Sequence, residues 1–96
     1  MNKYEAMFIV KPDLSEEDRK TAFSHVQDIL TKNKGVVTEA VVWADRRKLG
    51  FPIKKYQEGV YYLVTFDAPP ESITNIKYLY RVDESLLRVL ITRIEK

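Results

Sequence analysis

The segment from Trp43 to Lys55 carries the side chains best suited to chemistry, and that chemistry is the binding of phosphate. Its five cations fall within ten residues and are Arg46, Arg47, Lys48, Lys54 and Lys55. Of the 16 Lys and Arg residues, eleven lie outside this segment, against thirteen of the 14 Asp and Glu. Such a local excess of positive charge is typical of a protein that contacts a polyanion. A solvated surface loop has the same composition, so charge alone leaves both interpretations open.

Catalytic chemistry finds no support in the residue types. The chain has one histidine, His25, and no cysteine, which excludes disulfides, thiolate metal sites and cysteine nucleophiles. Ser85 and the other serines have no evident triad partner, and three glycines do not make a phosphate-cradling loop. We therefore predict a binding protein, with no enzyme activity, metal, cofactor or small-molecule substrate.

Length and composition restrict the class further. The 96 residues predict a single domain, residues 1–96, with one hydrophobic core. A hydrophobic fraction of 45% and a charged fraction of 31% are typical of a globular chain. No apolar run approaches the roughly 18 residues that cross a bilayer, and the N-terminus is charged where a signal peptide is apolar. We expect a cytoplasmic protein without membrane association.

The pattern of apolar residues predicts six elements. Ser15 is a good N-cap, the acidic residues after it suit a helix start, and Gly35 is expected to end that helix with a positive φ. In chain order we predict a strand over 4–11, a helix over 15–35, a strand over 36–43 that continues irregularly into the basic segment, and a strand over 60–66. A second helix is predicted to begin at residues 68–71 and to be broken at residues 83–85, followed by a strand over 86–94.

This order of elements predicts the fold. Strand–helix–strand crossovers are right-handed, so the simplest arrangement is a four-stranded antiparallel sheet with both helices on one face. That arrangement is the βαββαβ ferredoxin-like sandwich. The second and third strands then form a hairpin whose long tip carries the cations.

The sheet face without helices is also expected to be apolar. Alternating residues without charge, such as Phe8, Val64 and Val89, are assigned to the core. The opposite set predicts an exposed patch of Met7, Ile9, Tyr61, Leu63 and Leu90, with Glu5 and Arg88 near it. An apolar patch of this kind is typical of a docking surface for another protein, although loops or the last residues of the chain could also cover it.

Four segments, in order along nearly all 96 residues, resemble one family. They are Tyr4–Ser15 (YEAMFIVKPDLS), Arg46–Lys55 (RRKLGFPIKK), Gly59–Tyr62 (GVYY) and Asp83–Arg88 (DESLLR). Together they resemble the sixth protein of the bacterial small (30S) ribosomal subunit, with mild departures at Gly50, where that family often has Ala, and at Phe51, where it often has Tyr.

The resemblance implies a structural ribosomal protein that binds the central domain of small-subunit ribosomal RNA together with a small basic partner, ribosomal protein number eighteen of the same subunit. The five cations of the basic segment become candidate RNA contacts, with Arg88 a weaker one, and the apolar patch becomes the candidate partner surface. An alternative from the residues alone is a homo-oligomeric regulatory or ligand-binding module whose open sheet faces pair.

Overall fold

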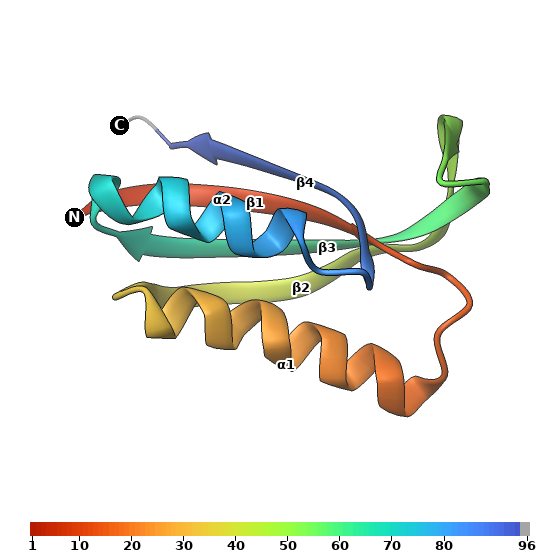
Figure 1. Ribbon diagram of the computed structural model, residues 1–96, viewed down its shortest axis with the longest axis horizontal. Coiled ribbons are helices and arrows are strands. Elements are labelled where there is room, and N and C mark those ends of the chain that lie inside the picture. Colours follow the sequence, from red (N-terminus) through yellow and green to blue (C-terminus); the bar gives the residue numbers. More distant parts are fainter. Residues whose placement is uncertain (95–96) are drawn as a thin grey trace.

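The computed structural model describes residues 1–94 and has the predicted order of elements (Figure 1). They are β1 (Asn2–Val10), α1 (Glu16–Lys32), β2 (Val36–Ile53), β3 (Tyr56–Ala68), a 3-10 turn η1 (Pro70–Ser72), α2 (Ile73–Arg81) and β4 (Leu86–Arg93). No helix in this part of the chain combines the length and the apolarity needed to cross a membrane.

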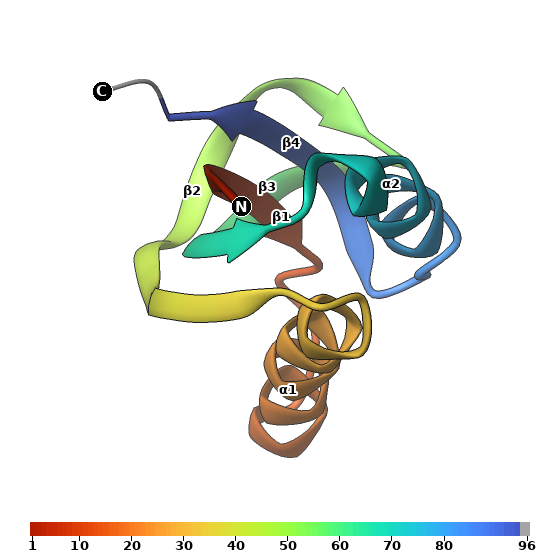
Figure 2. The same cartoon turned by 90° about the vertical axis from the view of Figure 1, so that its left-hand side faces the viewer.

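The four strands form one antiparallel sheet in the order β2-β3-β1-β4. Both helices cover the same face, as seen along the strands in Figure 2. The predicted ferredoxin-like βαββαβ sandwich is therefore confirmed. The two edges of the sheet are β2 and β4, and the other face has no helix on it.

The core lies between the sheet and the two helices. Phe8 and Phe66 are completely buried, and the ring of Phe8 meets Tyr80 of α2 edge-on at a centroid distance of 4.7 Å. The Tyr80 hydroxyl donates a hydrogen bond of 2.7 Å to the carbonyl oxygen of Val26 in α1. This bond joins the two helices inside the core, where an unpaired hydroxyl would be costly.

The start of α1 agrees with the prediction from the sequence, whereas its end does not. The Ser15 hydroxyl accepts the Asp18 amide, as predicted for an N-cap. The positive φ after the helix belongs to Lys34, at 67°, so the expectation for Gly35 was wrong. Gly35 serves another need, because a Cβ there would lie 2.7 Å from the Leu30 carbonyl oxygen. The position requires glycine for close approach rather than for its conformational freedom.

The paired part of the hairpin of β2 and β3 is longer than predicted, and its irregular course through the basic segment is confirmed. Pairing continues to Ile53 and Tyr56, so only Lys54 and Lys55 form the turn, both with positive φ of 49° and 73°. The register shifts four times along β2, and Arg46 at one such shift has φ of 52°. These bulges explain why the alternation of β2 could not be followed in the sequence.

Candidate nucleic-acid and protein interface

The open face of the sheet carries an apolar band. Strand register places residues of all four strands in one row, Val41–Leu63–Met7–Leu90. The next row toward the hairpin is Ala44–Tyr61–Ile9–Arg88, and the row on the other side is polar, Glu39–Thr65–Glu5–Thr92. At the two sheet edges, Val41 is 44% exposed and Leu90 is 55% exposed, while Met7, Leu63 and Tyr61 between them are partly buried. The face is thus a shallow apolar surface with a polar border.

One member of the predicted patch is not accessible. Ile9 lies on the open face but is only 8% exposed, because Leu49 of the hairpin and Leu87 of β4 pack over it as a small separate cluster. Gly59 makes this packing possible, since a Cβ there would collide with Ile9. The expectation that Ile9 is exposed was therefore wrong: the basic hairpin folds back over one end of the open face, a contact across 40 residues of sequence.

Two residues extend the apolar band beyond the predicted set. Val41 belongs to its central row, and Trp43 lies beside it, 51% exposed, with its ring 5.8 Å from that of Tyr61. Arg47 places its guanidinium 4.8 Å from the centre of the Trp43 ring and 6.0 Å from that of Tyr61. The single tryptophan of the chain could have indicated a contact residue, but the register shifts of β2 prevent its assignment to one face from the sequence.

The cations of the basic segment do not form one cluster at the tip. Arg46, Arg47 and Lys48 lie on the paired arm of the hairpin, whereas Lys54 and Lys55 form its turn. All five side chains are exposed, and within residues 1–94 none takes part in an ion pair. Asp45, the acidic neighbour of the arginines, instead pairs with Arg19 of α1 at 3.3 Å. The arm and the turn are thus two separate positive regions.

Arg88 lies on β4, at the edge of the sheet opposite the strand β2 that carries the hairpin arm. It is exposed on β4 opposite Ile9, in the second row of the open face. It therefore borders both the apolar band and the cluster that holds the hairpin down.

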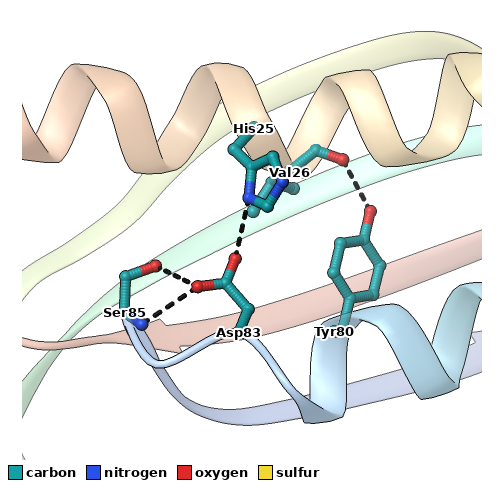
Figure 3. Close-up of polar contacts among 5 residues, drawn as sticks. All are labelled: His25, Val26, Tyr80, Asp83 and Ser85. Atoms are coloured by element: carbon teal, nitrogen blue, oxygen red, sulfur yellow. Dashed lines mark hydrogen bonds and ion pairs between the residues drawn. The ribbon is translucent and has the colours of Figure 1, made fainter.

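The structure brings together three polar residues that the sequence left separate. His25 Nδ1 lies 3.1 Å from Asp83 Oδ2, while Asp83 Oδ1 accepts the Ser85 amide at 3.0 Å and its hydroxyl at 2.7 Å (Figure 3). In a nucleophilic triad the histidine stands between the serine and the acid. Here the carboxylate stands in the middle, so the serine hydroxyl has no base. The cluster ties α1 to the turn before β4.

Two tyrosines have raised pKa values, and both act in the fold. Burial raises the pKa of Tyr80 far above its usual range, with the nearby Asp83 adding to the effect. The pKa of Tyr56 is raised chiefly by the 3.0 Å hydrogen bond that its hydroxyl donates to Asp13. This bond ties the tip of the hairpin, next to its two-residue turn, to the segment between β1 and α1. No group of three or more potential metal ligands occurs among residues 1–94.

Fold and surface together define a protein of the ferredoxin-like class, with an apolar sheet face beside a basic hairpin. Comparison with known proteins identifies the family to which the chain belongs. Residues 3–93 match the family model for ribosomal protein S6. Small ribosomal subunit protein bS6 of Campylobacter jejuni is 40% identical over 99% of this chain and 75% of its own length. The homologue of Helicobacter pylori is 38% identical over 99% of this chain and 66% of its own length.

Solved structures agree. The crystal structure of 30S ribosomal protein S6 from Thermotoga maritima has a TM-score of 0.89 at 29% identity, over 97% of this chain and 87% of that chain. The P2 domain of a chemotaxis kinase, solved in complex with a response regulator, has a TM-score of 0.56 at 14% identity, which shows a shared fold alone.

The chain belongs to the ribosomal protein S6 family. It is a structural protein of the small ribosomal subunit rather than an enzyme, and its place is the ribosome in the cytoplasm.

Proposed function

We propose that this chain binds the central domain of small-subunit ribosomal RNA jointly with a small basic partner, ribosomal protein number eighteen of the same subunit. The apolar band of the open face binds the partner, and the cations of the hairpin arm bind phosphates. The observation that carries the proposal is the adjacency of the two regions. Arg47 pairs with Gly59, directly beyond the row that contains Tyr61, and its guanidinium lies over Trp43 at the border of the band.

Adjacency matters because the chain is weakly charged. A formal net charge of +2 supplies little non-specific affinity for RNA. A basic partner seated on the open face would extend the positive surface without a break, and its RNA contacts would add to those of the hairpin. The polar row of Glu39, Glu5 and two threonines limits the apolar contact on the side away from the hairpin. Such a border is typical of the rim of a protein interface.

The RNA half is tested by removing charge from the arm without disturbing the backbone. Because Arg46 has a positive φ, Arg46→Asn is better suited than alanine, and Arg47→Gln accompanies it. Loss of two phosphate contacts should lower the slope of log K against log salt by about 1.5. The matched control is Lys20→Gln with Lys32→Gln on α1, which removes the same charge from exposed positions of another element. Equal slopes for the arm variant and the control would refute an RNA site on the arm.

The protein half is tested on the apolar band. Leu90→Asp changes an exposed residue at the sheet edge, and Leu63→Asp changes the centre of the row. Both substitutions should abolish binding of the partner. Binding is measured through the fluorescence of Trp43, the only tryptophan of the chain. The exposed Thr74→Asp on α2 is the control. Full partner affinity in a folded Leu90→Asp variant would refute the docking face.

Sedimentation of the pure chain examines the remaining alternative. The proposal requires a monomer, since the open face is kept for another protein. A stable dimer that Leu90→Asp dissociates would favour pairing of two copies instead.

A further inference from the structure

A second positive region lies at the edge strand β4, away from the hairpin arm. It is a groove of about 440 Å³ between α2 and β4. Its floor is apolar and buried, formed by Tyr80, Leu86 and Leu87. Four of its lining residues are exposed cations from three elements, Lys54, Lys77, Arg81 and Arg88, and none of its lining residues is acidic.

The fold brings these cations together from distant positions. Lys77 and Arg81 are four residues apart on α2, so they lie on one side of the helix a turn apart. Arg88 comes from β4, and Lys54 is carried in by the hairpin, which arches over the β4 edge toward α2 (Figure 2). Like charges at this helical spacing destabilise an isolated helix by a few tenths of a kcal/mol. None of the four has an ion-pair partner in the part of the chain that the structure describes.

The strand beside the groove adds donors of another kind. β4 is an edge of the sheet and pairs only with β1 among the described strands. The outer side of an edge strand presents unpaired backbone N–H groups. Backbone N–H groups are among the donors that contact phosphate oxygens in nucleic-acid complexes. Four cations without a carboxylate favour a polyanion over an extended peptide, because a peptide would leave the cations unneutralised.

We propose that the groove between α2 and β4 binds phosphate groups of an RNA strand, as a second contact separate from the hairpin arm. Lys77 and Arg81 are its new residues, and Lys54 links it to the hairpin. This inference rests on the proposed function and makes it more specific. The RNA would contact the protein at the arm and at the β4 edge, with the folded-back hairpin between the two contacts.

The test uses the full chain with its partner protein and the central-domain fragment of small-subunit ribosomal RNA. In the groove variant, Lys77→Gln is combined with Arg81→Gln. It should bind the RNA about 10- to 50-fold more weakly near 0.1 M salt and with a salt slope lower by about 1.5. The α1 control, Lys20→Gln with Lys32→Gln, should bind like the unchanged protein. Affinity for the partner without RNA, measured by Trp43 fluorescence, should be unchanged in the groove variant.

The outcomes separate the two proposals. If the arm variant weakens RNA binding and the groove variant matches the control, the groove inference is refuted and the proposed function stands. If neither variant differs from the control, both are refuted. If the groove variant loses the partner protein in the absence of RNA, the groove holds polypeptide and the inference is wrong. Circular dichroism of each variant verifies folding, and Lys77→Gln alone, at an exposed helix position, provides a second reading with a slope change of about 0.7.

Discussion

The turn of the basic hairpin holds two lysines in a conformation that lysine disfavours. Pairing of Ile53 with Tyr56 leaves a two-residue turn, and φ values of 49° and 73° at Lys54 and Lys55 make it a type I′ turn. Such turns strongly prefer Asn followed by Gly. A left-handed conformation costs a residue with a Cβ about 1–2 kcal/mol. The sequence thus keeps charge at positions where the backbone favours other residues, as is common at functional sites.

Lys55→Gly should therefore stabilise the fold. Relief of the left-handed strain contributes about 1–2 kcal/mol, and the greater freedom of glycine in the unfolded chain removes about 0.5–1 kcal/mol of that. The net gain of about 1 kcal/mol corresponds to a rise in Tm of about 4–8 °C for a domain of this size. Urea and thermal unfolding, followed by circular dichroism, measure both quantities.

Lys55→Ala is the matched control, because it removes the same charge but keeps the Cβ. It should not share the gain. The reasoning about the turn fails if Lys55→Gly leaves the urea midpoint unchanged or lowers it. It also fails if Lys55→Ala stabilises equally, since the gain would then come from charge rather than from backbone conformation. Under the proposed function, both variants should bind RNA more weakly, so that stability and binding change in opposite directions in the glycine variant.

Three further changes examine contacts that the structure shows. Leu49→Ala should lower the free energy of unfolding by about 2 kcal/mol, because Leu49 is 6% exposed over Ile9; a urea-midpoint change no larger than that of the exposed Phe51→Ala would contradict this packing. Tyr80→Phe should cost about 1–2 kcal/mol at pH 7 through loss of the bond to Val26. The pKa of Tyr80 is raised in the folded state, so its hydroxyl stays protonated there while the unfolded chain ionises near pH 10. The stability that the Tyr80 hydroxyl contributes is therefore fully present below pH 10, and above pH 10 the free energy of unfolding falls by up to about 1.4 kcal/mol per pH unit. Urea titrations of Tyr80→Phe should lack this fall. An alkaline slope in Tyr80→Phe equal to that of the unchanged protein would disprove it. Asp83→Ala should cost about 1–3 kcal/mol in thermal unfolding, because it removes both bonds from Ser85, whereas His25→Ala, at a mostly exposed ring, should cost less than about 0.5; equal losses would contradict this division.

The helices and the core strands could be predicted because their signals are local. Ser15 and the acids after it begin α1, and the uninterrupted alternation of β3 assigns Tyr62, Val64 and Phe66 to the core. These patterns depend on neighbours within a few residues, so one sequence suffices to read them.

The surface was less predictable, because its arrangement depends on long-range contacts and on bulges. Each register shift in β2 exchanges the two sides of the strand, so neither Val41 nor Trp43 could be assigned to a face. Ile9 alternates correctly onto the open face but is covered by Leu49, which no local pattern indicates.

Element order, fold class and the local excess of cations can all be predicted from the chain, since apolar periodicity, caps and charge are properties of short segments. Where that charge lies depends on the folded arrangement. Folding the hairpin back over Ile9 separates Lys54 from Arg46 and brings it to Lys77, Arg81 and Arg88. The physical reason is that burying Leu49 against β1 and β4 stabilises one position of the hairpin, and this contact joins residues that are far apart along the chain.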